Sequence, residues 1–579
     1  MTFSNFQNSK TNVRPLIFEA EKTTDPERLV SLLSQVSLKS EPVYRFVEAL
    51  LLWKLNYLDE LCNLLSTLPT SFHSDPQYWI FLGMYENAQS KGSSRSLFAY
   101  QKALLLSPGR ADIHFNLANS YSSFESSKAL HHYLVSLSID SLQSNVWHNL
   151  GNLLRDAKFF SCSLTAFKNA HFLSPYDVDI LCNFALSLIL NGSYKSAELT
   201  LVHCLTLNPN HFQSHLNLGF LFIKLRRINE AIINLQEALR LEGCSLCADL
   251  KFNLSLCHLL LCNYVIGWDL YENRLYTSMV PLSLHPSHGP LIESLDQLST
   301  NSSPPLLIWS EQGLGDCIQF CRYLLLLDAL FIDYDFLCPL PLIALIKNWL
   351  NPKGNVLELE TFMFSSDRLH CPLLSLPSLF STTLDSIPST LPYFSTPKNI
   401  PGHLIAGDSL GGLSVGIVWS TSPSNPIMYK NKSIPLKLLM PHLVKLMDLD
   451  LVNLHTLQVG PDASQVNPWL HHPRLIDWSS KLSNFSDTAF VISQFDLVIS
   501  VDTAVAHLSA ALNIPTWCLL SHDADFRWLI DRSDSPWYPG VMRLFRQDTL
   551  DDWSSVVKSV NTVFDDLFLL DISSVSSSI

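Results

Sequence analysis

The segment Leu306–Phe320, with the sequence LLIWSEQGLGDCIQF, decides the fold of the second half of this 579-residue chain. Its first four residues are apolar, as in a short buried strand, and a helical stretch follows. Gly313 and Gly315 lie between the two. Glycines in such a turn let a ligand approach the backbone, because no side chain stands in the way. Asp316 comes next and offers a carboxylate, so the segment predicts a strand, a glycine loop with a binding site, and a helix.

The alternation of short apolar runs with helical stretches continues to the end of the chain, which is typical of α/β folds with parallel sheets. A segment rich in Pro and Gly at residues 397–413 divides this half into two lobes, each opening with a strand. Ligands bind where loops leave the carboxyl ends of parallel strands, so we expect a site between two doubly wound lobes. Besides Leu306–Trp309, the predicted strands are Val415–Trp419, Leu451–Gln458, Leu497–Ser500, Thr516–Leu520 and Met542–Phe545.

The first half of the chain repeats itself. Leu150-Gly151, Phe184-Ala185 and Leu218-Gly219 share one spacing, and small residues keep the same register at Ser163, Ala197 and Ala231, and at Ala170, Cys204 and Ala238. One such unit resembles the tetratricopeptide repeat, a pair of antiparallel helices whose small residues allow a close crossing and whose second helix ends at a proline. The residues that carry the resemblance are Trp147, Leu150, Gly151, Phe167, Ala170 and Pro175.

Looser units precede and follow these repeats, and the last one runs from Leu250 to about Leu275. A single helical hairpin cannot bury its own apolar face, so stacked units are expected to form a solenoid whose concave groove holds a peptide or protein partner. The predicted domains are a helical cap (1–71), the solenoid (72–280), a linker (281–305), a first lobe (306–396), an inter-lobe linker (397–413), a second lobe (414–566) and a Ser-rich tail (567–579).

The charge and the cysteines restrict the function. The net charge of −14, without a cluster of Lys and Arg, argues against a nucleic-acid partner. The most apolar long stretch, Tyr323–Leu350, is interrupted by aspartates and prolines, so we expect no transmembrane segment. Thirteen scattered cysteines and a polar amino terminus fit a reducing cytoplasm. Cys244 and Cys247 suggest zinc, but no second pair follows, so they are interpreted as core residues and no metal is expected.

Two loops of the second lobe offer polar groups. The segment Trp419–Pro435, WSTSPSNPIMYKNKSIP, follows a predicted strand and supplies hydroxyls together with Lys430 and Lys432. The segment Phe495–Leu512, FDLVISVDTAVAHLSAAL, runs from a strand through a turn into a helix, with Asp502 and Thr503 at the helix start. A helix amino end carries unpaired N–H groups and a partial positive charge, which suit a pyrophosphate at Thr503 and Ala504. Asp502 can equally be the helix cap, and His507 can equally be a packing residue.

An ordered set of motifs supports a more specific interpretation. They are EQGLGDCIQFCRYL from Glu311, HCPLLSLPSLF from His370, VGIVWS from Val415, KNKSIP from Lys430, DLVISVDTAVAHLSAAL from Asp496 and DSPWYPGVMRLFRQ from Asp534. With these motifs the chain resembles bacterial tetratricopeptide proteins that have a C-terminal domain like glycosyltransferase family 9, which is related to the ADP-heptose:lipopolysaccharide heptosyltransferases. The resemblance covers nearly all of residues 72–565.

The resemblance implies an inverting, metal-independent glycosyltransferase of the two-lobed GT-B type, which uses a nucleotide-diphosphate sugar and needs no cofactor. Asp316 takes the position of the general base, which removes a proton from an acceptor hydroxyl. Lys432 and the helix start at Thr503–Ala504 would stabilise the leaving diphosphate. The remaining residues assigned to the nucleotide-sugar site are Gly313, Gly315, Ser420, Thr421, Gln458, Asp502 and His507.

Two alternatives stay open. Heptosyltransferases usually have a glycine where this chain has Ala504, which keeps the N–H but limits close approach. The second half can therefore be a degenerate fold, with the repeats acting as a non-catalytic scaffold. A protein O-glycosyltransferase is the other alternative, because the O-GlcNAc transferases also join such repeats to a GT-B domain. Their catalytic half does not resemble this one at the quoted motifs.

Overall fold

The computed structural model describes residues 14–37, 39, 42–241, 247–277, 289–297, 304–362, 368–396, 401–405 and 411–568. Much of the two predicted linkers, nearly all of the Ser-rich tail, the start of the predicted cap and Cys244 lie outside these residues. The chain divides into two units, Met1–Asn217 and Leu218–Ile579, and the boundary falls within one helix.

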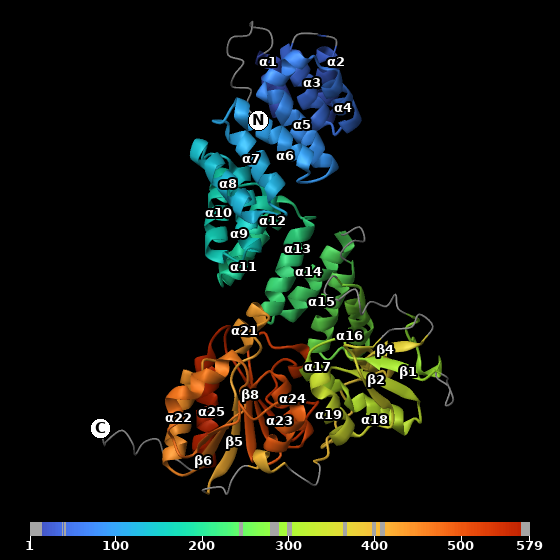
Figure 1. Ribbon diagram of the computed structural model, residues 1–579, viewed down its shortest axis with the longest axis vertical. Coiled ribbons are helices and arrows are strands. Elements are labelled where there is room, and N and C mark those ends of the chain that lie inside the picture. Colours follow the sequence, from blue (N-terminus) through green and yellow to red (C-terminus); the bar gives the residue numbers. More distant parts are fainter. Residues whose placement is uncertain are drawn as a thin grey trace, which may run out of the picture. The chain divides into compact units, whose positions relative to one another are not determined.

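The first unit is built from helices that pair in sequence (Figure 1). The close crossing predicted for each repeat is present, since a Cβ atom at Gly151 would lie only 2.8 Å from the ring of Phe167, and one at Gly83 only 2.5 Å from Tyr100. The helices are α1 (Arg14–Lys22), α2 (Pro26–Val36), α3 (Pro42–Lys54), α4 (Leu58–Thr67), α5 (Pro76–Gln89), α6 (Ser94–Leu106), α7 (Ala111–Tyr121), α8 (Ser126–Ile139), α9 (Ser144–Asp156), α10 (Phe160–Leu173), α11 (Val178–Leu190), α12 (Tyr194–Leu207) and α13 (Phe212–Lys224).

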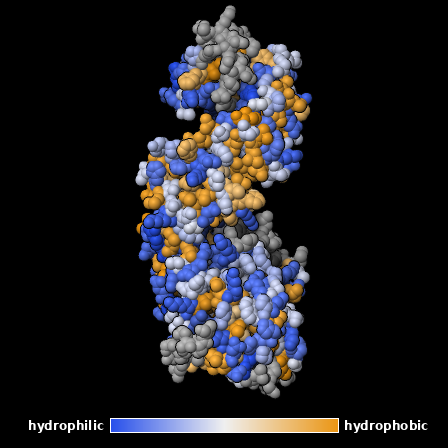
Figure 2. Space-filling model, turned by 90° about the vertical axis from the view of Figure 1, so that its left-hand side faces the viewer, coloured by the Kyte–Doolittle hydropathy of each residue, from blue (hydrophilic) through white to orange (hydrophobic). Residues whose placement is uncertain are grey.

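The first unit also leaves large apolar side chains at its surface. Figure 2 shows hydrophobic residues scattered among hydrophilic ones over this unit. Leu105, Phe172 and Tyr176 are each exposed by about three quarters or more of their area. Apolar atoms contribute to the surface of every soluble protein, so single exposed residues of this kind need no special explanation.

The second unit opens with the remaining helical pairs. After α13 come α14 (Ile228–Leu241), α15 (Cys247–Leu260) and α16 (Tyr264–Tyr271), followed by a 3₁₀ turn at Glu272–Tyr276. Gly219 faces Leu235, and Gly267 faces Leu259, with the same short separations as in the first unit. The repeat predicted to end near Leu275 is therefore a helical hairpin.

The first sheet has four parallel strands in the order β3-β2-β1-β4. They are β1 (Leu306–Trp309), β2 (Tyr334–Cys338), β3 (Asn355–Glu358) and β4 (His370–Pro372). The structure confirms β1 at the predicted bounds, whereas the sequence did not predict the other three. The helices are α17 (Leu314–Phe320), α18 (Arg322–Ala329), α19 (Ile343–Leu345), which continues into a wider turn at Ile346–Leu350, and α20 (Leu376–Leu379).

The second sheet has six parallel strands in the order β10-β9-β8-β5-β6-β7. This is the strand order of the Rossmann fold, with its switch point between β5 and β8. The strands are β5 (Leu413–Val418), β6 (Val452–Thr456), β7 (Leu475–Asp477), β8 (Leu497–Val501), β9 (Thr516–Leu520) and β10 (Met542–Arg546), of which only β7 was not predicted. The helices are α21 (Pro426–Lys432), α22 (Leu436–Asp448), α23 (Phe485–Ile492), α24 (Ala504–Ala511) and α25 (Trp553–Leu567).

Helices cover both faces of the second sheet. Helices α22 and α25 pack on one face and α23 and α24 on the other (Figure 1). The core that contains α23 and α24 continues without interruption into α17 and α18 of the first lobe. The loop after β1 and the loop after β8 therefore meet, because the helices that they open, α17 and α24, pack against each other.

Candidate functional site

A cavity of about 570 Å³ lies at the carboxyl ends of β5, β6 and β8. This is the switch point of the six-stranded sheet, where doubly wound folds bind ligands. Its volume lies within the range of small-molecule sites, about 300 to 1,000 Å³. Apolar walls come from Met428, Val459 and Phe485. Most of the residues predicted from the sequence line it, namely Gly315, Ser420, Thr421, Lys432, Gln458, Asp502, Thr503 and Ala504.

An ion pair between Lys432 and Asp502 joins two loops of this cavity. Lys432 Nζ donates to Asp502 Oδ2 at 2.5 Å, and both side chains are at least four fifths buried. Burial opposes ionisation of the carboxyl group, but Lys432 outweighs it and lowers the pKa of Asp502 to about 2. Burial likewise disfavours the ammonium group, yet Asp502 raises the pKa of Lys432. Both groups are therefore charged at neutral pH.

The amino end of α24 also faces the cavity. The cap of this helix is Thr503, so the alternative interpretation of Asp502 as the cap is wrong. The Thr503 side chain does not cap the helix, because its hydroxyl bonds the Ser500 hydroxyl at 3.0 Å. An anion such as a phosphate is favoured at a helix amino end by the backbone N–H groups and the helix dipole. Ala504, the first residue of α24, lines the cavity directly.

Gln458 and the hydroxyl loop form the frame of the cavity. Gln458 Oε1 accepts from the N–H groups of Trp419 and Ser420 at 3.1 and 2.9 Å. Its Nε2 donates to the carbonyl groups of Ser420 and Val459. The side-chain amide thus ties the end of β5 to the end of β6, which gives Gln458 a structural role. Thr421 is held through its N–H, which donates to Ser433 Oγ at 3.1 Å.

Asp316 lies beside the cavity and is not part of its lining. Its Oδ2 accepts from the N–H of Gly313 at 2.9 Å, and its Oδ1 accepts from Arg527 Nη2. The side chain keeps one fifth of its area exposed. Burial raises the pKa of the Asp316 carboxyl group, and Arg527 opposes the shift without cancelling it. The group therefore accepts a proton more readily than an ordinary aspartate.

The two predicted glycines have different surroundings. Gly313 has a φ angle of −65°, which any residue can adopt. A Cβ atom at Gly315 would lie 3.2 Å from His507 Cδ2 and 3.5 Å from Ala504 Cα. Gly315 therefore lets α17 approach α24, which is a reason for a glycine that the sequence analysis did not give.

His507 is a packing residue of α24, next to the point where Gly315 of α17 approaches that helix. Its Nδ1 lies 2.9 Å from Tyr538 Oη, and its ring stacks on Trp528 with 5.3 Å between centroids. Burial lowers the pKa of His507 to about 3, so the ring is neutral. Like Gly313, it is not among the residues that line the cavity. The structure thus favours the packing interpretation over ligand contact.

Sequence reasoning missed Arg527, the partner of Asp316. It lies in a 3₁₀ turn, Phe526–Trp528, in the loop after β9. Besides Asp316 it bonds Asp525 at 2.6 Å and Gln319 Oε1 at 2.8 Å, and its side chain is 8% exposed. The signal for it was its place after a predicted strand, since β9 and β8 are neighbours and their loops emerge at one edge.

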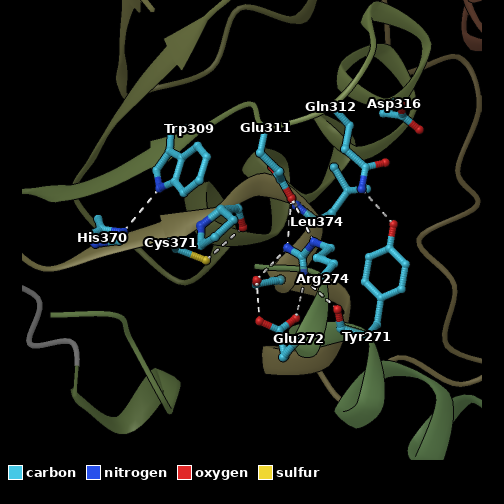
Figure 3. A network of polar contacts seen from close by, with 12 residues as sticks. Tyr271, Glu272, Arg274, Trp309, Glu311, Gln312, Asp316, His370, Cys371 and Leu374 are labelled. Carbon is cyan, nitrogen blue, oxygen red and sulfur yellow. Dashed lines mark hydrogen bonds and ion pairs between the residues drawn. The ribbon is translucent and has the colours of Figure 1, made fainter. Parts of the chain in front are cut away.

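A second buried arginine, Arg274, was also missed. It donates to Glu311 Oε1 at 2.8 Å, just before the glycine loop (Figure 3).

In the described part of the chain, no group of three or more His, Cys, Asp or Glu side chains is arranged to hold a metal ion. Among the same residues, no helix is long and apolar enough to cross a membrane.

Comparisons with known proteins concern the helical repeats. A tetratricopeptide-repeat family model matches residues 212–243, the α13–α14 pair. No curated protein matches the chain. Tetratricopeptide repeats suggest a protein or peptide partner. The family match agrees with the repeat register found in the sequence.

Three of the solved structures similar to this chain are YrrB, PilF and the Cut9–Hcn1 complex. YrrB, described as a TPR protein with an unusual peptide-binding site, is 19% identical, with 30% of this chain and 90% of that one covered and a TM-score of 0.27. PilF of Pseudomonas aeruginosa is 22% identical, with coverages of 35% and 89% and a TM-score of 0.30. The Cut9–Hcn1 hetero-tetramer of APC/C is 16% identical, with coverages of 48% and 56% and a TM-score of 0.39.

Proposed function

We propose that this chain is an inverting, metal-independent glycosyltransferase of the GT-B type that uses a nucleotide-diphosphate sugar. The observation that carries the proposal is the cavity at the β5–β8 switch point, which joins apolar walls to the amino end of α24 and Lys432. A nucleotide base suits the apolar walls, and a diphosphate suits the helix end. The cavity lies beside the loop that carries Asp316, so a carboxylate that can act as the general base is close to it.

In this proposal Asp316 takes the proton of an acceptor hydroxyl as that oxygen attacks the anomeric carbon. The new bond forms between the acceptor oxygen and that carbon, and the bond from the carbon to the diphosphate breaks, so the diphosphate leaves with the electron pair. A base works best when its pKa approaches the working pH, and burial moves the pKa of Asp316 in that direction. The proton is thus transferred to a carboxylate that Arg527 and Gly313 hold in place.

The side chains that line the cavity bring one positive charge to the leaving diphosphate, that of Lys432, and two negative ones, those of Asp462 and Asp502. Lys432 already has Asp502 as its counter-ion, so its net attraction for a phosphate is reduced. The backbone N–H groups at the start of α24 then supply the rest of the stabilisation, which costs no rearrangement because the helix fixes them. The N–H of Ala504 is consequently a more important phosphate contact in this proposal than the side chain of Lys432.

A polypeptide partner for the repeats is part of the proposal. The first unit has a cavity of about 500 Å³ whose walls carry the carboxamides of Asn119, Asn149 and Asn152. A carboxamide both donates and accepts, so it matches a peptide group whatever the side chain beside it. Lys91 and Asp156 also line this cavity, so it shows no strong preference for one sign of charge.

One observation favours the non-catalytic alternative. Both carboxylate oxygens of Asp316 already accept a bond, and the residue is not in the cavity wall. A scaffold with a degenerate fold would keep such a pair for stability alone. The two functions differ in whether the chain binds nucleotide diphosphates, and this can be measured before any acceptor is known.

We would test a panel of nucleoside diphosphates and nucleotide sugars on the full chain by thermal shift and then calorimetry. A ligand at one hundred times its Kd stabilises a protein by about 2.7 kcal/mol, which a melt detects. Selective binding is the expected result. A folded chain that binds none of the panel would reject the transferase in favour of the scaffold.

A substitution at the helix end makes the test specific. Ala504→Pro removes one N–H at the first helical position, where proline is tolerated, and the preceding Thr503 is already extended. Loss of one N–H bond to a charged group should weaken diphosphate binding by about tenfold or more. Ser94→Pro, at the exposed first residue of α6, is the matched control and should leave the affinity unchanged.

A further inference from the structure

The helical hairpin α15–α16 and the turn after it contact both of the loops that meet at Asp316. One is the glycine loop after β1, which carries Asp316 at its end. The other is the turn after β9, which carries Arg527. Each loop supplies one member of the Asp316–Arg527 pair. The geometry of the pair therefore depends on whatever holds the two loops.

Arg274 holds the glycine loop through Glu311. Its Nη2 donates to Glu311 Oε1 at 2.8 Å and to Ser375 Oγ at 2.8 Å, and its Nη1 donates to Glu272 Oε1 at 2.9 Å (Figure 3). Arg274 is 3% exposed, and the Glu311 side chain is 5% exposed. Glu311 Oε1 also accepts from the N–H of Leu374, beside β4. One arginine thus links the last repeat to the loops after β1 and β4.

Tyr271 reaches both loops at once. Its Oη accepts from Gln312 Nε2 at 3.1 Å, one residue before Gly313 (Figure 3). Its ring packs at a steep angle against Phe526, with 5.8 Å between centroids, and Trp268 packs on Phe526 in the same way. Phe526 directly precedes Arg527. A single buried residue of the repeats therefore contacts both the glycine loop that leads to Asp316 and the residue that precedes Arg527.

Further contacts fix the loop after β9 to the preceding repeat. Lys224, at the end of α13, donates to Asp523 at 3.0 Å, and Arg226 donates to Asp531 at 2.9 Å. These ion pairs lie on either side of the turn that carries Arg527. The repeats thus hold this loop by charge at its ends and by aromatic packing at its middle.

We infer that Tyr271 and Arg274 are positioning residues, by which the last repeat sets the geometry of the Asp316 site. The inference rests on the proposed function for the chemistry of Asp316, whereas the placement of the loops does not depend on it. The repeats at this end are then an integral support of the site and not a detachable adaptor. In agreement with this, the unit that contains the two sheets also contains α15 and α16.

Two substitutions in the full chain test the inference. Arg274→Lys keeps the charge but loses the planar fork that reaches three side chains at once. Tyr271→Phe keeps the ring on Phe526 and removes only the hydroxyl that Gln312 contacts, so it is the milder change. Arg240→Lys is the control, because Arg240 pairs with Glu237 on the exposed face of α14.

The first readout is hydrogen exchange of the segment 313–320. We expect faster exchange there in both test variants, and an unchanged rate in the control. The second readout is the pH profile of transfer, using the donor found by the binding panel. We expect kcat/KM to fall by about tenfold and the acid limb to move, while the Kd for the nucleotide stays within about twofold of wild type.

The two readouts separate the inference from the function on which it rests. Faster exchange in both variants, without detectable transfer by the wild type, would support the positioning role and count against the transferase. Transfer by both variants with the exchange rates and pH profile of the control would overturn the positioning role and leave the transferase standing. If Arg274→Lys does not fold, the same two outcomes are read from Tyr271→Phe.

Discussion

Two largely buried aspartates lie in the loops after β1 of the first sheet and β8 of the second, and they differ in the effect of the cation beside them. Asp502 faces Lys432, and Asp316 faces Arg527. The pKa of Asp502 is lowered to about 2. The pKa of Asp316 is raised, although an arginine touches it. Contact with a cation is thus not enough to lower the pKa of a carboxyl group.

The difference comes from how each cation is shared. Burial pushes both pKa values upward. Lys432 has Asp502 as its bonded carboxylate, and its charge, together with a smaller effect of Arg527, outweighs that cost. Arg527 divides its donors among Asp316, Asp525 and Gln319, and the carboxylate of Asp525 further disfavours a second negative charge nearby. Asp502 is consequently suited to hold a lysine, whereas Asp316 is suited to take up a proton.

The largest expected effect is the loss of transfer rate when the proposed general base is removed. Asp316→Asn should lower kcat/KM for transfer by about 10²- to 10⁴-fold, the usual contribution of a general base. The Kd for the nucleotide should stay within about twofold, because the cavity lining is unchanged. Calorimetry and steady-state rates on the same preparation check both parts. Asp525→Asn, which removes the other carboxylate on Arg527, should lower the rate by less than tenfold.

The pH profile sharpens this prediction. A base is active when deprotonated, so the rate should fall as the pH drops through the pKa of Asp316. Because that pKa is raised, the acid limb of kcat/KM should lie above the ordinary aspartate value of 3.8. A wild-type rate in Asp316→Asn, or a pH profile without an acid limb, would show that Asp316 is not the general base. The proposed difference in role between Asp316 and Asp502 would then be wrong.

The next effect concerns stability, for which we expect the opposite order: substitution of Asp502 should cost more than substitution of Asp316. Asp502→Asn leaves Lys432 charged and buried without a counter-ion, which typically costs about 3 kcal/mol. Asp316→Asn should cost less, because Arg527 keeps its ion pair with Asp525 when the Asp316 carboxylate is removed. The stability losses of both variants are measured by guanidinium chloride unfolding and, in a second experiment, by hydrogen exchange of β5 and β8. Equal losses in the two variants would contradict the assignment of different roles.

The sign of the pH dependence follows from the lowered pKa of Asp502. Its stabilising contribution is complete above the unfolded value near 3.8 and is lost as the pH falls toward about 2. The stability difference between wild type and Asp502→Asn should therefore be constant between pH 7 and pH 5. It should shrink only below about pH 4, and a decline at pH 6 would assign the effect to another group.

The fold could be predicted where a pattern is local. Strands β1 and β9 have the predicted bounds because each is a predominantly apolar run beside a turn. Strand β2 was hidden in the stretch Tyr323–Leu350, where helix and strand are equally apolar and periodicity does not separate them. Strand β4 has only three residues, His370–Pro372, too few for any period to appear.

The site could be predicted only in part, for a related reason. Asp502 and Ala504 stand at a strand-to-helix junction that the sequence displays, so their place in the cavity follows from local pattern. The pairing of Asp316 with Arg527 arises from packing between α17 and the loop after β9, which are 211 residues apart in the sequence. No periodicity reports such a contact, and Arg274 with Glu311 is a second case of the same kind.

The smallest expected effect tests how tightly the two aspartate sites are joined. Helices α17 and α24 touch at Gly315, where a new Cβ atom would lie 3.2 Å from His507 Cδ2. His507 cannot easily move, because Tyr538 bonds its Nδ1 and Trp528 stacks on its ring. Gly315→Ala should therefore cost about 1 kcal/mol, the lower end of the range for overpacking.

Gly313→Ala is the matched control, two residues earlier on the same loop. Gly313 is exposed, its φ angle is −65°, and a Cβ atom there would meet only Asp316 Oδ2 within 4 Å. Alanine should be tolerated, since the smaller freedom of the unfolded chain offsets this one contact. Denaturant unfolding of both variants gives the comparison. If Gly315→Ala is as stable as Gly313→Ala, then α17 and α24 separate without cost, and Asp316 can shift relative to the cavity more freely than a positioned base allows.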